Sequence, residues 1–147
     1  MKKTLPLALI TVLLSITALT SSSSAAITKP ASFYNDCGVK AVQEPSNITQ
    51  YCADANAGVT NLKWSSWAKT AVGTGTYYIN ACDPTCVSGK TYKTAVRVTL
   101  SNLTKRKGKM YYMNVTVSPM PGKSFVWPPK QRPVPKKVTW ITDMWRS

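Results

Sequence analysis

An alternation of side chains decides the fold, and it is clearest in residues 91–101, TYKTAVRVTLS. Successive side chains of a β-strand point to opposite faces of the sheet, so every second residue shares a face. One face of this stretch would carry Tyr92, Thr94, Val96, Val98 and Leu100, and the other Lys93, Ala95, Arg97 and Thr99. We therefore expect a strand that buries Val96 and Val98 and exposes Arg97.

A partner for this strand follows at residues 110–118, MYYMNVTVS. Val115 and Val117 share a face there with Tyr111 and Met113. Two β-rich runs around a polar link that contains glycine predict a hairpin with both valines buried. The link, residues 102–109, would form a loop longer than the commonest hairpin turns.

Three further strands are expected before this hairpin, at residues 48–52, 59–67 and 71–82. Gly73 and Gly75 interrupt the third, and glycine inside a strand often marks a bulge or bend. We expect the irregularity in that strand.

The second of these strands holds two tryptophans three positions apart. On a regular strand this spacing sends Trp64 and Trp67 to opposite faces, with Leu62 on the Trp64 side. The sequence thus predicts Trp64 inside the domain and Trp67 over an edge or a bulge. An exposed tryptophan could also stack on a sugar or a base.

The two ends of the domain differ from its middle. Residues 27–35 are expected to be a loose lead-in. Residues 119–135 hold six of the ten prolines, a density that no central strand tolerates, so this segment should run extended over the surface. Residues 138–145 favour a returning edge strand.

These patterns predict an all-β domain, a small antiparallel β-sandwich or barrel of five to six strands stapled by disulfides.

The N-terminus is typical of an export signal. Lys2 and Lys3 precede an apolar run, residues 5–19, and Ser24-Ala25-Ala26 fits the rule for cleavage after small residues. The run is about 15 residues long, short of the roughly 20 that span a bilayer, which argues against an uncleaved anchor. We expect residues 1–26 to be removed near Ala26, leaving a single secreted or extracytoplasmic domain, residues 27–147.

The four cysteines predict disulfides, because small exported domains commonly rely on them. Cys82 and Cys86 lie across a tight turn and can approach bonding distance. That leaves Cys37 with Cys52, a loop of about 15 residues worth about 3 kcal/mol. Crossed pairings stay open because four cysteines allow three connectivities. A Cys₄ zinc site would lack the usual pair of Cys-x-x-Cys knuckles.

Residues 37–100 carry a spaced pattern of three elements: Cys52-Ala53-Asp54, Trp64-Ser65-Ser66-Trp67 and Cys82-Asp83-Pro84-Thr85-Cys86. Together with Cys37, Pro45, Ile48, Asn56, Leu62, Gly73, Gly75, Asn80 and Gly89, they resemble a group of small exported, uncharacterised actinobacterial proteins. Ala68 stands where that pattern has a glycine. The resemblance implies export and brings no activity with it.

Positive charge is concentrated in the second half of the chain. The formal net charge is +14, and residues 88–147 hold thirteen Lys or Arg against Asp143 alone. Such asymmetry favours an acidic partner, although a solvated basic surface that only maintains solubility remains an alternative. The candidate binding residues form two groups, Lys105, Arg106, Lys107 and Lys109 in the hairpin link, and Lys130, Arg132, Lys136 and Lys137 in the tail.

Aromatic side chains accompany the second group. Trp127, Trp140 and Trp145 lie among these tail cations and Arg146, a mixture that suits an anionic polymer or a lipid surface. We therefore expect a non-catalytic, secreted or envelope-associated module that binds an anionic cell-wall polymer or membrane surface. Export argues against nucleic acid as the partner.

Little catalytic chemistry is available. The chain has no histidine, which excludes Ser-His-Asp and Cys-His arrangements and every His-ligated metal site. No phosphate-cradling glycine motif or other cofactor signature is present. Asp36, Asp54 and Asp83 each lie within two residues of a cysteine, so disulfides could gather them. A small secreted hydrolase using these carboxylates is the alternative function, and a calcium site or ordinary turn chemistry are further interpretations of the same residues.

Overall fold

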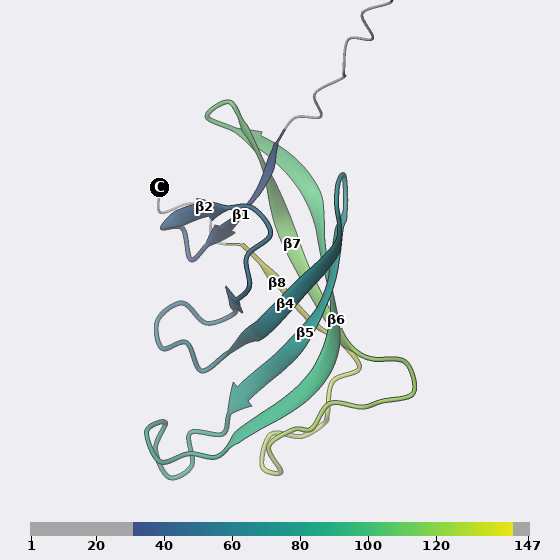
Figure 1. Ribbon diagram of the computed structural model, residues 1–147. Helices are drawn as coiled ribbons and strands as arrows, with labels where there is room; N and C mark the ends of the chain where they lie inside the picture. The colour runs from purple at the N-terminus through teal and green to yellow at the C-terminus, as the bar shows by residue number, and fades with distance from the viewer. Residues whose placement is uncertain (1–30, 143–147) are drawn as a thin grey trace, which may run out of the picture.

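The computed structural model describes residues 31–142, which form eight β-strands and no helix (Figure 1). The predicted signal, residues 1–26, the first part of the lead-in, and residues 143–147 lie outside the described part of the chain. Within the described residues no helix is long and apolar enough to cross a membrane. The prediction of an all-β domain is therefore confirmed.

The strands differ widely in length, from two to sixteen residues. In chain order they are β1 (Ser32–Asp36), β2 (Lys40–Val42), β3 (Ile48–Thr49), β4 (Ala57–Trp67), β5 (Ala71–Asn80), β6 (Thr91–Arg106), β7 (Lys109–Pro119) and β8 (Val138–Ile141).

All eight strands belong to one sheet that curls into a half-barrel (Figure 1). Its order is β2-β1-β7-β6-β5-β4-β3, and β8 pairs with β7 beside β1. Neighbouring strands are antiparallel except β1 and β7, which run parallel. The sheet is thus mixed, with more strands than the five to six predicted from the sequence.

The two ends of the curled sheet, β2 and β3, are consecutive in the chain, joined by residues 43–47. The Cys37–Cys52 disulfide ties the β1–β2 turn to the loop after β3. Beside it the Tyr34 hydroxyl of β1 donates a hydrogen bond to the Thr49 carbonyl, at 3.4 Å. We call this line of contact between the two sheet ends the seam. It closes the half-barrel with a covalent bond where a full barrel would have strand pairing.

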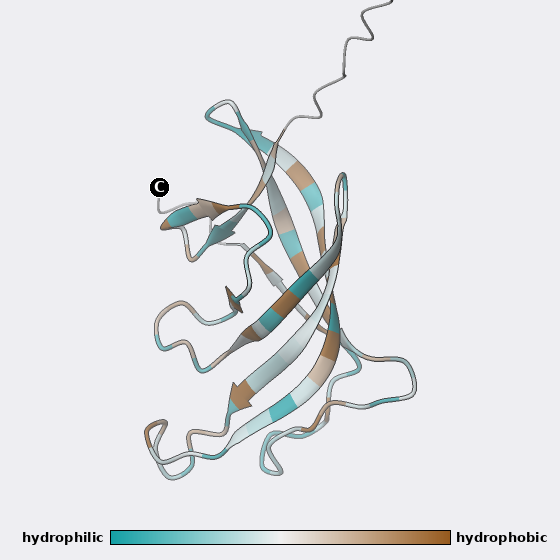
Figure 2. Ribbon diagram, in the orientation of Figure 1, coloured by the Kyte–Doolittle hydropathy of each residue, from teal (hydrophilic) through white to brown (hydrophobic). Residues whose placement is uncertain are grey.

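The concave side of the sheet holds the core. Val96, Val98, Val115 and Val117 are completely buried and Arg97 is exposed, as the alternation predicted. Figure 2 shows the matching bands of hydrophobic and hydrophilic residues along β6 and β7. Tyr77 of β5 lies fully buried in the same cluster.

The β6–β7 hairpin is longer than its sequence suggested. The predicted loop of residues 102–109 is mostly strand, because pairing continues to Arg106 opposite Lys109. Only Lys107 and Gly108 form the turn, with φ angles of 43° and 78°. Two consecutive positive φ values are the requirement of the tightest hairpin turn, and glycine meets it without strain.

The bulges lie in β4, and not in β5, where Gly73 and Gly75 predicted them. Pairing shifts between Thr60 and Lys63 and again between Trp64 and Ser66. The second shift undoes the alternation, so Trp64 and Trp67 pack against the core together, with ring centroids 4.8 Å apart. The prediction that they occupy opposite faces is wrong for this reason.

Gly73 and Gly75 make room for the bulged strand. A Cβ atom on Gly73 would lie 2.9 Å from Trp64 Cε3, and one on Gly75 would lie 2.8 Å from the Thr60 carbonyl oxygen. Atoms do not approach that closely without displacement. The two glycines are therefore contact points for the neighbouring strand, and β5 itself stays regular.

Two other segments differ from their predictions. The described end of the lead-in is strand β1, because Ser32 and Phe33 pair with Met110 and Tyr111 of β7. Residues 48–52 form only a two-residue strand before the disulfide. The second half of the predicted 138–145 strand falls mainly outside the described residues, and β8 ends at Ile141.

Of the predicted proline-rich segment, residues 119–135, Pro119 ends β7 and the rest forms no strand, as predicted. The segment also packs against the sheet, whereas the sequence predicted only that it runs over the surface. Phe125 is 5% exposed and its ring lies 5.4 Å from that of Tyr77. The Val126 amide donates to Thr94 Oγ1 at 2.8 Å. The segment thereby covers one end of the half-barrel.

Candidate functional site

The two disulfides predicted from cysteine spacing are present, Cys37–Cys52 and Cys82–Cys86. No free cysteine occurs among the described residues, so none of them offers a thiolate nucleophile or a thiolate metal ligand. Two disulfides fit an extracytoplasmic location.

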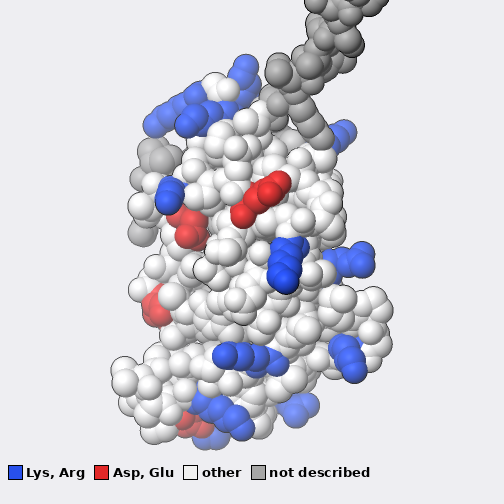
Figure 3. Space-filling model, in the orientation of Figure 1, with Lys and Arg blue, Asp and Glu red and all other residues white. Residues whose placement is uncertain are grey.

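The hairpin tip, residues 105–109, carries the first predicted group of cations. Lys105, Lys107 and Lys109 are exposed and Arg106 is half-buried at the end of the β6–β7 pair. Lys109 Nζ lies 5.3 Å from the centre of the Phe33 ring, a cation–π contact between the tip and β1. Figure 3 shows the positive charge gathered over this end of the molecule.

The second group of cations lies at the opposite end, in the segment that follows β7 (Figures 1 and 3). Lys130 Nζ pairs with Asp83 Oδ2 at 2.7 Å. This hydrogen bond, reinforced by the carboxylate charge, raises the pKa of Lys130. Lys130 is thus engaged with the Cys82–Cys86 loop. The fold keeps the two predicted groups of cations apart.

Two of the predicted residues do meet. Arg132 and Lys136 line one hollow of about 510 Å³ together with Lys123, and we call it the basic hollow. All three cations are exposed, while Phe125 is buried and Trp127 half-buried in its wall. Lys137 is exposed and lies outside this lining. A concave site with converging cations and an aromatic wall suits an anionic group.

The aromatic wall is fixed from below by the core. The Trp127 ring stacks on Tyr77 with centroids 6.2 Å apart and planes 2° from parallel. Phe125 meets the edge of Trp127 at 5.7 Å. The wall of the basic hollow is therefore held by aromatic packing against the core. Its cations belong to residues 120–137, which form no strand.

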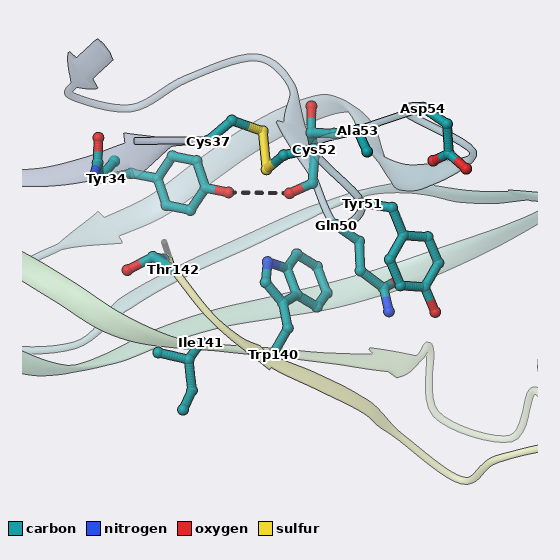
Figure 4. A pocket seen from close by; sticks show the side chains of 12 residues that line it. Tyr34, Cys37, Gln50, Tyr51, Cys52, Ala53, Asp54, Trp140, Ile141 and Thr142 are labelled. Atoms are coloured by element: carbon teal, nitrogen blue, oxygen red, sulfur yellow. Dashed lines mark hydrogen bonds between the residues drawn. A yellow bond between two sulfur atoms is a disulfide. The ribbon is translucent and has the colours of Figure 1, made fainter. Parts of the chain in front are cut away.

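A second hollow, of about 410 Å³, opens at the seam, and we call it the seam hollow (Figure 4). Tyr34, Tyr51 and Trp140 give it aromatic surface, and Gln50 and Asp54 give it polar groups. Tyr34 is almost fully buried, and this burial raises the pKa of its hydroxyl, with a further contribution from Asp36. The hydroxyl therefore stays protonated at neutral pH.

Comparison with models of protein families, with curated proteins and with solved structures finds no match for this chain.

The three carboxylates of the hydrolase alternative are not brought together. Asp54 lines the seam hollow, whereas Asp83 pairs with Lys130 in another hollow, at the Cys82–Cys86 loop between β5 and β6. Asp36 is half-buried, and its Oδ1 has no hydrogen-bond partner among the described residues. No group of three His, Cys, Asp or Glu in the described part of the chain could hold a metal ion.

Sequence reasoning missed several residues of both hollows. Lys123 was not among the predicted cations, because it shares the basic hollow with Arg132 and Lys136 only through the folding back of residues 120–137. Tyr51 and Gln50 were assigned to a strand that ends at Thr49. Trp140 was grouped with the basic tail, yet it faces the seam hollow, whose described lining holds no Lys or Arg.

Proposed function

We propose that the protein is a non-catalytic, secreted or envelope-associated module that binds an anionic cell-wall polymer. The observation that carries this proposal is the basic hollow, where Lys123, Arg132 and Lys136 surround one concavity. The binding unit would be a phosphate or carboxylate group of the polymer, held by charge-assisted hydrogen bonds from Arg132 and the two lysines.

The hairpin tip would be a second contact for the same polymer. Its cations stand on the far end of the sheet, so one extended polyanion could touch both sites, and linked weak contacts raise the overall affinity. Surface charges of this kind attract over a distance set by salt, about 8 Å at physiological ionic strength. Retention should therefore fall steeply as salt is added.

The test compares three variants of the full chain that each remove exposed cations. The hollow variant is Lys123→Gln, Arg132→Gln and Lys136→Gln. The tip variant is Lys105→Gln, Lys107→Gln and Lys109→Gln. The control variant is Lys63→Gln, Lys93→Gln and Arg97→Gln, which removes as much charge as the hollow variant from exposed positions on the sheet.

The probes are poly(glycerol phosphate) and vesicles containing phosphatidylglycerol, each at low and physiological salt. We expect the hollow variant to bind poly(glycerol phosphate) at least about tenfold more weakly than the control variant, with an unchanged melting temperature. Equal losses in all three variants would show that net charge alone attracts the polymer. Preference for the vesicles, with loss mainly in the tip variant, would assign the surface to a membrane and contradict the polymer.

A further inference from the structure

The seam hollow differs from the basic hollow in charge, lining and support. It lies where the two ends of the curled sheet meet, between the Cys37–Cys52 bridge and strand β8 (Figure 4). Its volume of about 410 Å³ falls within the range of about 300–1,000 Å³ that small-molecule sites occupy. It is a separate candidate site, and its ligand need not resemble that of the basic hollow.

The walls are held from several directions. On one side the disulfide fixes Cys52 and the Tyr34 hydroxyl holds the Thr49 carbonyl. On the other side Thr142 is tied to β7 by two hydrogen bonds, from its amide to the Met113 carbonyl at 2.8 Å and from its hydroxyl to the Tyr112 carbonyl at 2.9 Å. A ligand would therefore meet a site that is already formed, which lowers the entropy cost of binding.

Aromatic surface is available for an apolar ligand face. Tyr51 is 50% exposed, a large fraction for a ring on a fixed loop, and Trp140 is half-buried across from it. The faces of aromatic rings carry partial negative charge and attract the slightly positive hydrogens of C–H groups. A ligand ring with C–H groups on one face can lie against either aromatic ring.

Polar groups with unused hydrogen-bonding capacity line the same space. The indole nitrogen of Trp140 is buried beside the Tyr34 hydroxyl and lowers the pKa of that hydroxyl, yet it has no acceptor in full hydrogen-bonding geometry among the described residues. A buried donor without an acceptor is costly, and a ligand oxygen would relieve that cost. Gln50 Oε1 accepts a hydrogen bond from the Tyr77 hydroxyl at 2.8 Å, which leaves the amide hydrogens of Gln50 to donate to a ligand.

An acceptor completes the set. Asp54 is exposed at the rim, and its two carboxylate oxygens already accept hydrogen bonds from Asn56, at 3.2 and 2.6 Å. These bonds orient the carboxylate, and each oxygen keeps a lone pair for a further donor. Two donors and an acceptor beside aromatic rings match a ring whose hydroxyl groups both donate and accept.

The charge of the lining narrows the ligand class. Asp54 contributes a carboxyl group to the lining of the seam hollow, and the described lining includes no Lys or Arg. An anionic ligand would meet an uncompensated carboxylate there, so a phosphate or uronate is disfavoured. The ligand should be neutral or cationic.

From this combination we propose that the seam hollow binds one uncharged sugar ring. The ring stacks its C–H face on Tyr51 or Trp140, places one oxygen at the Trp140 indole N–H, and donates a hydroxyl to Asp54. The proposal does not depend on the polymer-binding function, because none of these residues lines the basic hollow. A quaternary ammonium ion is the rival ligand, since it would also suit aromatic rings beside a carboxylate. It would leave the Trp140 and Gln50 donors unused.

The experiment is an NMR titration of the full chain, following backbone amide and tryptophan indole signals. The probes are the methyl glycosides of glucose, galactose, mannose and N-acetylglucosamine at millimolar concentration, with tetramethylammonium as the rival. We expect at least one glycoside to shift the Trp140 indole signal and the amides of Gln50 and Tyr51. Signals from Trp127 and the basic hollow should not move.

Three variants of the seam hollow and one control distinguish binding of a sugar from binding of a cation. Tyr51→Ala, at an exposed position that leaves the core intact, should weaken glycoside binding at least about tenfold, and Trp140→Phe should do so by removing the N–H donor. Trp127→Phe is the matched control and should bind as the unchanged chain does. Asp54→Asn keeps an acceptor oxygen and removes the charge, so it should preserve most sugar binding but abolish binding of a cation.

Each contrary result would overturn the proposal. These are no shift with any of the four glycosides, shifts that survive both Tyr51→Ala and Trp140→Phe, or shifts with tetramethylammonium alone that vanish in Asp54→Asn. The last result would assign the hollow to a quaternary ammonium ligand.

Discussion

The Tyr77 hydroxyl donates a hydrogen bond of 2.8 Å to Gln50 Oε1. The aromatic ring of Tyr77 stacks on the ring of Trp127. One buried tyrosine thus contacts a residue of the seam hollow with its hydroxyl and a residue of the basic hollow with its ring. The two hollows share a support in the core.

Replacing Tyr77 with Phe should therefore act on one hollow and spare the other. The ring stacking is retained, while Gln50 loses a buried partner, so we expect a loss of about 1 kcal/mol in the free energy of unfolding. Urea unfolding measures this loss. Tyr51→Phe, at a ring that is 50% exposed, is the control and should stay close to the unchanged chain. A loss of polymer binding in Tyr77→Phe would contradict the separate roles of hydroxyl and ring.

The two disulfides should contribute unequally. Cys37–Cys52 closes a loop with a sequence separation of 15 residues and Cys82–Cys86 one of 4. On the chain-entropy model, replacing the first pair with serine should cost about 3 kcal/mol and the second about 2 kcal/mol. Only the first replacement should also abolish ligand shifts at the seam hollow. Denaturant unfolding of the two double variants gives the comparison, and peptide mapping without reduction checks the pairing. If the variant without Cys82–Cys86 lost as much free energy of unfolding as the variant without Cys37–Cys52, or more, the seam disulfide would not be the main covalent support of the fold.

Stability should decline in alkali because burial raises the pKa of Tyr34 and of Tyr77. A tyrosine with a raised pKa keeps its proton in the folded state at a pH where the unfolded chain has lost it. Its contribution is complete below the unfolded value of about 10 and is lost as the pH rises from there toward the folded pKa.

The expected slope is at most about 1.4 kcal/mol for each pH unit and each of these tyrosines. Tyr34→Phe should flatten the decline above pH about 10, although it also loses the hydrogen bond to Thr49. Thermal unfolding between neutral and alkaline pH measures both effects. Parallel curves for the variant and the unchanged chain would show that Tyr34 does not titrate with unfolding.

The contact between Gly73 and Trp64 predicts a further change in stability. An alanine at position 73 would press on Trp64 Cε3 and on the Lys63 carbonyl, each 2.9 Å from the new Cβ atom. We expect Gly73→Ala to destabilise the protein by about 1–3 kcal/mol, the usual cost of overpacking. Ser66→Ala, at an exposed position of the neighbouring strand, is the control. Urea unfolding of both variants measures the difference, and equal stability would mean that the bulge adapts without cost.

The sequence predicted the parts of the fold that follow a regular period. Val96, Val98, Val115 and Val117 are buried and Arg97 is exposed because nothing interrupts the alternation around them. The disulfide pairing was also predictable in outline, because local loops close more readily than distant ones.

The failures lie where a neighbouring strand, rather than the local sequence, sets the geometry. Trp64 and Trp67 share a face because β4 bulges against β5, a shift that their spacing does not record. Lys123 joins Arg132 and Lys136 only through the folding back of a proline-rich segment. The seam hollow joins residues of β1, the loop after β3 and β8, which no single stretch of sequence contains.

The parallel pairing of β1 with β7 also sets the order in which the chain can fold. The Ser32 hydroxyl shares a hydrogen bond with the hydroxyl of Tyr112, a residue 80 positions later. Strand β1 can therefore pair with β7 only after most of the chain has been synthesised. Contacts between such distant residues form slowly, because a long loop must close before they contribute. Until then β1, β2 and the cysteine between them have no sheet to join. The sheet of such a chain can be completed only after β7 has been synthesised, whatever the other strands have formed by then.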